Sequence, residues 1–336
     1  MLTNPKQLNE DHNLDYTLRP SSFKEYVGQT KVKDNLDILI KAAHKRKEPI
    51  DHILLYGSSG LGKTTLAHII ARELGTNIKI TSGPTIEKVG DLASILTNLE
   101  EGDILFCDEC HRLNRSIEEA LYPAMEDFVL DIIIGKGPSA RTLQLNLPRF
   151  TFIGATTQIG LISTPLRSRF GATYRLDFYE EEDIEQIISR SAKILNVNIS
   201  NPAALRIIAS AARRTPRVAN RLLKRVRDYS QVRADGIINE TIANEALTML
   251  EVDHFGLEPS DRRLLETIIK KFNGGPVGLQ TLAIAANEDP GTVGDVYEPY
   301  LIQLGFLMRT PRGRTATKLA YDHLGLNYPE EQNKLL

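Results

Sequence analysis

A glycine-rich segment, residues 57–64, has the residue types needed to hold a triphosphate. Its sequence, GSSGLGKT, fits the pattern G-x-x-x-x-G-K-[ST], and it lies between an apolar run at 53–56 and a helical pattern at 64–74. Glycines let backbone N–H groups turn toward a phosphate, and the start of a helix adds partial positive charge. We expect Lys63 to reach the β- and γ-phosphates of ATP and the Thr64 hydroxyl to bind Mg²⁺. The flanking strand and helix patterns argue against a simple glycine turn beside a coincidental lysine.

Two carboxylates follow a second apolar run at residues 104–107. Because open α/β sheets bind ligands at the carboxyl ends of their strands, Asp108 and Glu109 are expected beside the glycine-rich segment. We expect Asp108 to hold Mg²⁺ through water and Glu109 to act as general base on the attacking water. Alone, such a pair also occurs as simple solvation of a strand end, so its weight comes from the phosphate-binding segment.

Residues 107–111, CDECH, match the haem-attachment pattern C-x-x-C-H and contain the C-x-x-C redox spacing. Both interpretations are disfavoured. Haem attachment of this type belongs to exported proteins, and the polar residues 1–11 do not resemble an export signal. Cys107 lies on a strand that should be buried, where it would pack as a small hydrophobe. A closed zinc site would need more ligands than His111 supplies nearby.

Several polar residues later in the chain are candidates to complete a triphosphate site. Thr156 ends a third apolar run, where a hydroxyl holds the attacking water, touches the γ-phosphate or merely caps the strand. Arg167 and Arg169 are two residues apart and cannot share one helical face, so one can pair internally while the other projects to a neighbour. Arg217 opens a basic helix pattern. Taken singly, each arginine is more typical of a solvated surface charge.

The pattern of elements predicts three domains. Short apolar runs alternating with helices predict an α/β domain, residues 1–177, with a parallel sheet covered on both faces. An all-helical domain is predicted at 178–251, with helices at 180–195, 202–214, 217–232 and 239–250. Residues 252–336 show helix patterns at 261–272, 279–286 and 292–304, then two short runs joined by a Pro/Gly turn. That order is typical of a winged helix.

Composition restricts the location and the partners of the protein. The 336 residues are 41% hydrophobic and 25% charged, and no run approaches the about 18 apolar residues of a membrane helix. Two cysteines and the absence of a signal pattern predict a cytoplasmic protein. The formal net charge is −2, so any contact with DNA has to come from local basic patches.

Two turns are candidate contact surfaces. Arg309, Arg312 and Arg314 surround a Pro/Gly turn on the predicted wing, where they would bind phosphates without sequence preference; the alternative is a solvated turn. Residues 130–147 read as a hairpin with its turn at 135–138. Apolar residues near its tip suggest a partner site, although a hairpin that only packs on its own domain would look the same.

Taken together, these motifs resemble the AAA+ ATPases and, more closely, the RuvB family of Holliday-junction branch-migration motors. The resemblance runs from about residue 15 to 326. It is carried by the segments at 18–20, 25–29, 121–128, 215–223, 274–278, 298–302 and 309–314. Two positions depart from the family pattern, because Ser58-Ser59 replace the usual prolines and Cys110 replaces isoleucine. Neither departure removes a catalytic group.

The resemblance implies roles at matching positions. Nucleotide contacts are implied for Leu18, Arg19, Gly60, Lys63, Thr64, Thr65, Glu126, Asp127, Phe128, Tyr179 and Arg217. Thr156 would be the first sensor, Arg217 the second, and Arg169 the finger inserted into the next subunit's site. Arg309 and Arg314 match DNA-contacting positions. The family forms homohexameric rings around duplex DNA, and its partners are RuvA, at the 130–147 hairpin, and RuvC.

The expected function is therefore an ATP-driven motor that moves duplex DNA and drives branch migration in recombination, DNA repair and the SOS response to DNA damage. Two other functions share parts of this pattern. A clamp-loader or initiator-type switch protein would have the same phosphate-binding segment, helical domain and arginine finger. A winged-helix transcription regulator with an ATPase module would instead read bases in a specific sequence.

Overall fold

The computed structural model describes residues 2–4, 17–134 and 141–329. The chain divides into two compact units, which we describe separately. The first, residues 15–179, is called the ATPase domain below. The second comprises residues 1–14 and 180–336 and contains the lid and the winged region.

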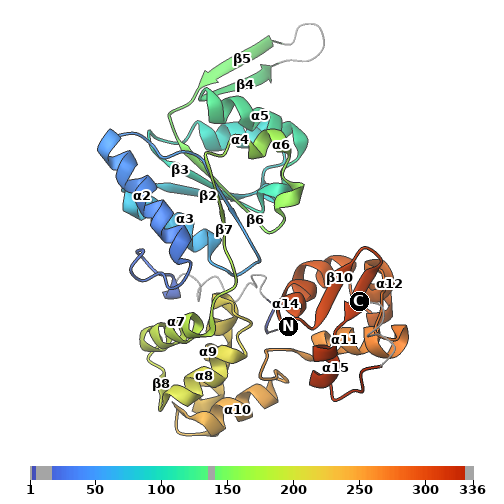
Figure 1. Cartoon of the computed structure of the whole chain (residues 1–336). Helices are drawn as coiled ribbons and strands as arrows, with labels where there is room; N and C mark the ends of the chain where they lie inside the picture. Colours follow the sequence, from blue (N-terminus) through green and yellow to red (C-terminus); the bar gives the residue numbers. More distant parts are fainter. Residues whose placement is uncertain (1, 5–16, 135–140, 330–336) are drawn as a thin grey trace. The chain divides into compact units, whose positions relative to one another are not determined.

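The ATPase domain is built on a parallel sheet of five strands in the order β2-β3-β6-β1-β7. The strands are β1 (Ile53–Tyr56), β2 (Ile78–Ser82), β3 (Ile104–Asp108), β6 (Thr151–Thr156) and β7 (Ala172–Arg175). The three apolar runs identified in the sequence are β1, β3 and β6, and they are neighbours in the sheet (Figure 1). The predicted parallel sheet is confirmed.

Alternate residues of the buried strands face opposite layers of helices. Leu54, Leu105, Cys107 and Phe152 join one core with α4 (Val89–Leu96), α5 (Arg115–Glu126) and α6 (Thr164–Arg167). The helices α2 (Thr30–Arg46) and α3 (Lys63–Leu74) cover the other face. Both faces of the central strands β1, β3 and β6 are thus buried, which explains why these strands are mostly apolar, whereas the edge strands β2 and β7 carry polar, partly exposed residues.

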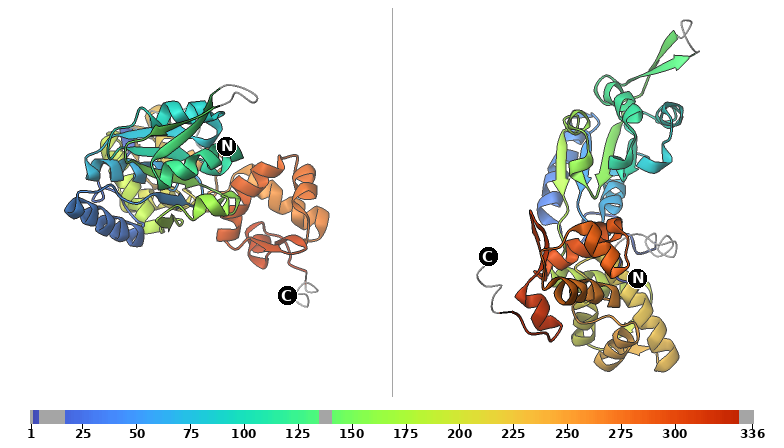
Figure 2. Two further views of the ribbon diagram at one scale, coloured as in Figure 1. Left: turned by 90° about the horizontal axis from the view of Figure 1, so that it is seen from above. Right: turned by 90° about the vertical axis from the view of Figure 1, so that its right-hand side faces the viewer.

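A hairpin of β4 (Val129–Ile134) and β5 (Arg141–Asn146) leaves this domain directly after α5 and projects away from the sheet (Figures 1 and 2). Its antiparallel register pairs Leu130 with Leu145 and Ile132 with Leu143. Leu130 is buried at the base, whereas Leu143 is 46% exposed. The predicted turn at 135–138 lies outside the described residues.

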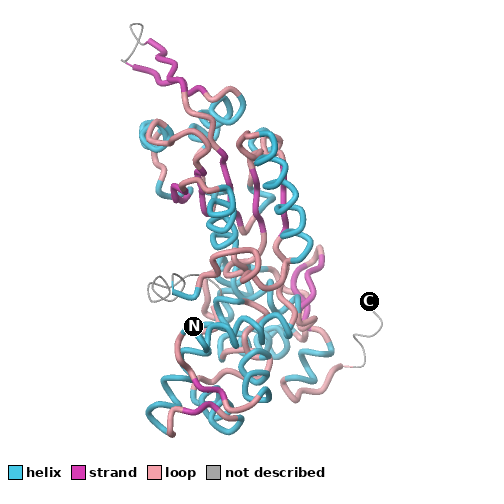
Figure 3. Tube along the Cα trace, turned by 90° about the vertical axis from the view of Figure 1, so that its left-hand side faces the viewer, coloured by secondary structure: helices cyan, strands magenta, loops and turns pink. Residues whose placement is uncertain are grey.

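The lid contains α7 (Glu181–Ile194), α8 (Pro202–Ser210), α9 (Pro216–Arg233) and α10 (Glu240–Met249). The prediction that no strand interrupts these helices is wrong, because β8 (Asn198–Ile199) pairs with β9 (Ile237–Ile238) in parallel (Figure 3). Strands of two residues are too short to show any periodicity in sequence. Helix α8 also ends before the predicted residue 214, since Arg213 and Arg214 take φ values of 52° and 50°.

The winged region contains α11 (Pro259–Phe272), α12 (Leu279–Ala286) and a segment in which the predicted helix 292–304 is divided. That segment comprises α13 (Pro290–Thr292), a π-helical turn at Val293–Tyr297 and α14 (Glu298–Gln303). Pro299 lies in the first turn of α14, where its missing N–H is tolerated. The strands β10 (Leu307–Thr310) and β11 (Gly313–Ala316) form the wing, and α15 (Lys318–His323) follows. Within the described residues, no helix is long and apolar enough to cross a membrane.

Candidate functional site

The glycine-rich segment joins β1 to α3 and has the backbone of a phosphate-binding loop. Gly57, Gly60 and Gly62 have φ values of 144°, 78° and 98°, which side chains other than glycine rarely adopt. A Cβ on Gly57 would lie 2.3 Å from the Leu176 carbonyl oxygen, so space also excludes a side chain there. Lys63 is buried, and its ammonium donates to the carbonyl oxygens of Gly57 at 2.8 Å and Ser58 at 2.9 Å. The ammonium is thus already held inside the loop.

The carboxyl ends of three neighbouring strands bring the predicted catalytic residues to one edge of the sheet. Strand β6 lies between β1 and β3, and its register pairs Thr156 with Tyr56 and Gly154 with Cys107. The N–H of Gly57 donates to the Thr156 carbonyl oxygen at 3.2 Å. The loop after β1, the carboxylates after β3 and the threonines after β6 are therefore adjacent, as predicted from the sequence.

Glu109 is oriented by two side chains that the sequence did not single out. Its backbone takes a φ of 48°, and its N–H donates to Asp108 Oδ1 at 2.9 Å. The Thr157 hydroxyl donates to Glu109 Oε2 at 3.3 Å, and His111 Nδ1 lies 3.2 Å from the same oxygen. The available signal was the second hydroxyl, at Thr157, directly after the apolar run that forms β6.

Thr156, the expected first sensor, has different contacts. Its side chain is fully buried, its Oγ1 lies 2.9 Å from His111 Nδ1, and it accepts the Gln158 N–H at 2.9 Å. Of the two threonine hydroxyls, the one at Thr157 reaches the proposed general base. Thr157 therefore joins Thr156 as a candidate sensor, because it contacts Glu109 directly whereas Thr156 contacts His111.

The donor set at this edge suits a magnesium ion. The Thr64 hydroxyl and the Asp108 carboxylate are oxygen ligands from half-buried residues at the start of α3 and the end of β3. Hard cations such as Mg²⁺ take oxygen ligands and commonly retain water and phosphate oxygens alongside one or two protein groups. Among the described residues, no group of three or more His, Cys, Asp or Glu side chains forms a metal site independent of phosphate.

Two tyrosines fasten the start and the end of the ATPase domain to the phosphate-binding loop. The Tyr179 hydroxyl lies 3.2 Å from both the Leu61 carbonyl oxygen and the Tyr26 hydroxyl, and its one O–H donates within this group. Burial raises the pKa of Tyr26 to about 12, so this phenol stays neutral at physiological pH. Tyr179 was expected at the nucleotide on resemblance, and Tyr26 was not assigned a role.

The amino-terminal segment of the ATPase domain runs beside the same helix. Leu18 is buried, and Arg19 lies close enough to His68 on α3 to affect its titration. Burial first, and then the charges of Arg19 and Arg72, lower the pKa of His68 to about 4. Arg19 is thus a fixed positive charge next to the helix that begins at Lys63. Arg217 belongs to the second unit, in the first turn of α9.

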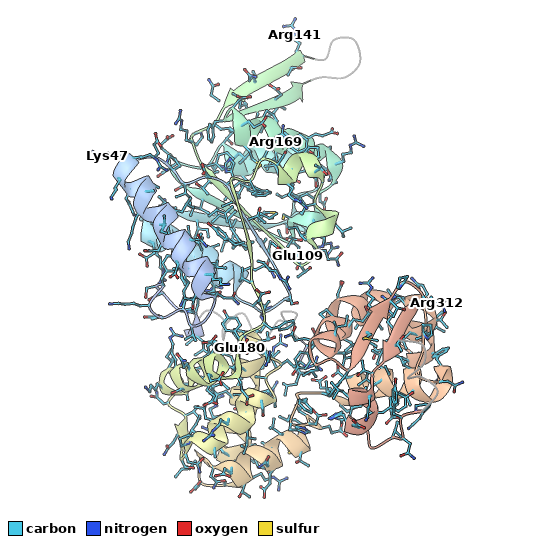
Figure 4. The ribbon with its side chains drawn as sticks, viewed as in Figure 1. Lys47, Glu109, Arg141, Arg169, Glu180 and Arg312 are labelled. Atoms are coloured by element: carbon cyan, nitrogen blue, oxygen red, sulfur yellow. The ribbon has the colours of Figure 1, made fainter. Side chains whose placement is uncertain are left out.

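Arg169 lies away from Glu109 of the same chain (Figure 4). Its Nη2 donates to Glu126 Oε2 at 3.1 Å, and its Nη1 donates to the Pro165 carbonyl oxygen at 2.7 Å. Arg167, two residues earlier, is exposed. Of the two arginines, the one matched to the family's finger therefore makes the internal contacts. Glu126 is the last residue of α5, and Asp127 follows it as an exposed residue.

Phe128 packs on the core of the ATPase domain below the hairpin. It has a φ of 55°, and its ring meets Phe150 edge-on with centroids 6.0 Å apart. Together with Glu126 and Asp127, it forms the connection from α5 into β4. The three residues expected at the nucleotide on resemblance thus lie in the part of the domain that carries Arg169.

The wing presents two of its three arginines to solvent. Arg309 and Arg312 are exposed, and Figure 4 shows Arg312 at the outer end of the winged region. The prediction that Arg314 faces solvent together with the other two is wrong, because Arg314 is only 8% exposed. Its guanidinium pairs with the buried carboxylate of Glu298 on α14 through two bonds, one of them 3.1 Å from Nη2 to Oε2. A distant carboxylate of this kind leaves no signal near the turn in sequence.

Both cysteines are buried and carry thiols rather than thiolates. Burial raises the pKa of Cys107 and of Cys110, and the neighbouring Asp108 adds to both shifts. Since the thiolate is the reactive form, this environment opposes redox chemistry and metal binding. The structure supports the interpretation of both residues as small core hydrophobes.

Sequence comparisons cover the chain with three consecutive family models. Residues 18–176 match the Holliday junction DNA helicase RuvB P-loop domain, residues 179–253 the RuvB AAA lid domain, and residues 254–325 the RuvB C-terminal winged helix domain. The chain is 58% identical over 332 residues to a protein of Dehalococcoides mccartyi, Holliday junction branch migration complex subunit RuvB. That match covers 99% of this chain and 95% of the relative. The corresponding protein of Chloroflexus aurantiacus is 59% identical over 329 residues, 98% and 94% of the two chains.

Comparisons of structure agree. The solved structure described as the Thermotoga maritima RuvB Holliday junction branch migration motor is 50% identical, with a TM-score of 0.85. It covers 93% of this chain and all of its own. The Aeropyrum pernix ORC2 protein, with a TM-score of 0.53 and 14% identity over 84% of this chain and 88% of its own, shares the fold alone. On these matches over nearly its whole length, the chain belongs to the RuvB family of P-loop AAA+ ATPases.

Proposed function

We propose that this protein is the motor subunit that moves duplex DNA through a ring and drives branch migration of Holliday junctions at the expense of ATP. One observation carries the proposal. Lys63, Glu109 and Thr157 meet at one edge of the sheet, whereas Arg169 of the same chain lies away from that edge (Figure 4). A site that needs this arginine has to receive it from another copy. The names of the relatives supply the substrate.

The residues at the sheet edge divide the chemistry between them. The glycine loop and Lys63 bind the phosphates, with Leu18, Arg19, Gly60, Thr64, Thr65 and Tyr179 completing the contacts in the same domain. A magnesium ion held by Thr64, and by Asp108 through water, would neutralise charge that develops on the phosphate oxygens. Glu109 accepts the proton of the attacking water. Thr157 and His111 fix the carboxylate that does so, because both contact its Oε2.

Assembly into a homohexamer completes each site. Arg169 would enter the neighbouring subunit's site, with Glu126, Asp127 and Phe128 next to it, and stabilise the charge of the transition state. Arg217 of the lid is the proposed second sensor, which couples the state of the nucleotide to the position of the lid. Staggered cycles of lid closure and release around the ring would then pull duplex DNA through its centre.

Two surfaces suit the remaining partners. On the wing, the exposed Arg309 and Arg312 favour sequence-independent phosphate contacts, whereas the ion pair of Arg314 with Glu298 favours a structural role for that residue. The projecting hairpin exposes Leu143 and suits RuvA, the junction-binding protein. RuvC would join the same complex on resolution of the junction, and the cytoplasm is the proposed location.

The alternative is a switch protein of the initiator or clamp-loader type. The likeness of this chain to ORC2 does not favour that alternative, because it is a likeness of fold alone. The deciding experiment is branch migration of a synthetic four-way junction, with and without RuvA and ATP. We expect separated duplexes with wild-type protein, RuvA and ATP, and none with Glu109→Gln, which should still bind ATP. A wild-type protein that binds the junction and hydrolyses ATP but never moves the branch point would contradict the motor and favour the switch.

A further inference from the structure

We infer that Tyr122 and Glu126 form a cradle that positions Arg169 for the neighbouring subunit's site. The inference rests on the proposed function, in which Arg169 acts between subunits. In this cradle Tyr122 acts on Arg169 alone, and the role of Glu126 toward Arg169 does not depend on any contact with the nucleotide.

The guanidinium of Arg169 is held on three sides. Glu126 Oε2 accepts from Nη2 at 3.1 Å, and the Pro165 carbonyl oxygen accepts from Nη1 at 2.7 Å. Its Cζ also lies 4.3 Å from the centroid of the Tyr122 ring, well within the range of a cation–π contact. Charge, a backbone dipole and an aromatic face together define the position and the plane of the guanidinium.

The cradle is built on rigid elements. Tyr122 and Glu126 are four residues apart on α5 and therefore share one face of the helix. The opposite face, which includes Ile117 and Leu121, is buried in the core. The Tyr122 hydroxyl also lies 3.3 Å from Ser163 Oγ, the N-cap of the helix α6 that leads to Arg169. The core that α5 shares with Leu166 of α6 fixes the two helices relative to each other, and the hydroxyl contact adds only a little to it.

The contacts hold Arg169 without consuming its capacity to bind a phosphate. The side chain remains 20% exposed, and its two hydrogen bonds use one N–H each on Nη1 and Nη2, which leaves each of these nitrogens a second N–H. A guanidinium has five N–H donors, so donors remain for a phosphate oxygen. Because a free arginine side chain loses rotational freedom when it is fixed, holding it before the reaction lowers the barrier of the step it assists.

The opposite role for the same contacts is a latch that keeps Arg169 out of use. The two roles predict opposite changes in ATP turnover when the contacts are removed by mutation. Removing a latch raises the turnover of ATP, whereas removing a cradle lowers it. Glu126 is 54% exposed, so its contact with Arg169 can be removed without leaving a buried charge unpaired.

The first test is steady-state ATP hydrolysis by full-length variants. We expect Tyr122→Leu and Glu126→Ala to lower kcat about fivefold to thirtyfold, with the KM for ATP and the ring assembly seen in sedimentation nearly unchanged. Tyr122→Phe keeps the aromatic face and should stay within about twofold of wild type. Glu119→Ala is the matched control, because Glu119 is on the same helix but pairs with the exposed Arg115 at 2.9 Å. An unchanged or raised kcat in Tyr122→Leu and Glu126→Ala would overturn the cradle.

The second test mixes two variants, and it distinguishes a misplaced Arg169 from a general structural defect of the Tyr122→Leu subunit. Tyr122→Leu subunits have an intact phosphate site and a misplaced Arg169. Glu109→Gln subunits have an inactive phosphate site and a well-placed Arg169. In mixed rings, a Tyr122→Leu site next to a Glu109→Gln subunit receives a well-placed Arg169. The ATPase rate of the mixture should therefore exceed the sum of the two separate rates. If the mixture shows no gain, the defect of Tyr122→Leu lies in its own phosphate site, and the cradle is overturned.

The same mixture with Arg169→Ala separates this inference from the proposal beneath it. If Arg169→Ala is inactive alone and gains activity with Glu109→Gln, the shared site stands, and the result for Tyr122→Leu decides the cradle by itself. If Arg169→Ala alone hydrolyses ATP at the wild-type rate, or gains nothing in the mixture, the shared site fails and the cradle fails with it. Arg167→Ala, which alters the exposed neighbour, should behave as wild type throughout.

Discussion

At the scale of single residues, neighbouring side chains of the same type have different environments. Thr156 and Thr157 are adjacent, yet the first hydroxyl is buried against His111 and the Gln158 N–H, whereas the second donates to Glu109. Thr156 is the last residue of β6 and Thr157 lies in the bend that follows, so the two side chains have different surroundings. Thr156 supports the end of β6, and Thr157 reaches Glu109, the proposed general base.

This difference predicts that two isosteric substitutions affect different properties, one the catalytic rate and the other the stability of the fold. Thr157→Val should lower kcat about tenfold or more while leaving nucleotide affinity and the melting temperature near wild type, because only the orientation of Glu109 is lost. Thr156→Val should lower the free energy of unfolding by about 1–3 kcal/mol, because it leaves the Gln158 N–H without its acceptor. Steady-state kinetics and urea denaturation of both variants provide the measurements. A normal kcat in Thr157→Val together with a large loss in Thr156→Val would leave Thr156 as the sensor.

At the scale of elements, the wing shows how a cation can support a binding surface without belonging to it. Arg314 and Arg309 are cross-strand partners in the hairpin of β10 and β11. Only Arg309 faces solvent, because the side chain of Arg314 turns to the buried carboxylate of Glu298. The ion pair fastens β11 to α14 and so fixes the turn that presents Arg312.

We therefore expect the Arg309→Ala variant to be impaired in DNA binding and the Arg314→Ala variant to be impaired in stability. Arg309→Ala should weaken binding to random duplex DNA and reduce the dependence of log K on log salt by about one unit, with an unchanged melting temperature. Arg314→Ala should lower the free energy of unfolding of the second unit by about 3–5 kcal/mol, because Glu298 is left buried and unpaired. Salt-dependent fluorescence anisotropy and thermal melting measure the two effects. Full stability of Arg314→Ala with a reduced salt slope would return this residue to the DNA surface.

Elements with strong local signals could be predicted from the sequence, and those specified by distant contacts could not. The strands β1, β3 and β6 and the helix α12 follow from apolar runs and helical spacing. The two-residue strands β8 and β9 and the π-helical turn before Glu298 are too short for any periodicity. The burial of Arg314 and the contact between Arg169 and Glu126 join residues 16 and 43 positions apart, respectively. No pattern near either arginine reports such a partner.

At the scale of the whole molecule, the second unit is joined internally by a buried ion pair. Arg213, between α8 and α9 of the lid, pairs with Asp261 on α11, and its Nε donates to the Gly256 carbonyl oxygen at 2.8 Å. Its guanidinium also lies 5.1 Å from the centroid of the Tyr300 ring. A movement of the lid within this unit would thus be transmitted to the DNA-facing winged region, which a motor of the proposed kind requires.

The proposed mechanism requires that hydrolysis take place between two copies of the chain. The most direct measurement is the ATPase rate per subunit as a function of protein concentration, in the presence of duplex DNA, with the oligomeric state followed in parallel by mass photometry. We expect the rate per subunit to be near zero for monomers and to rise together with ring formation. A constant rate per subunit down to concentrations at which only monomers are present would show that each chain completes its own site, and would contradict the account.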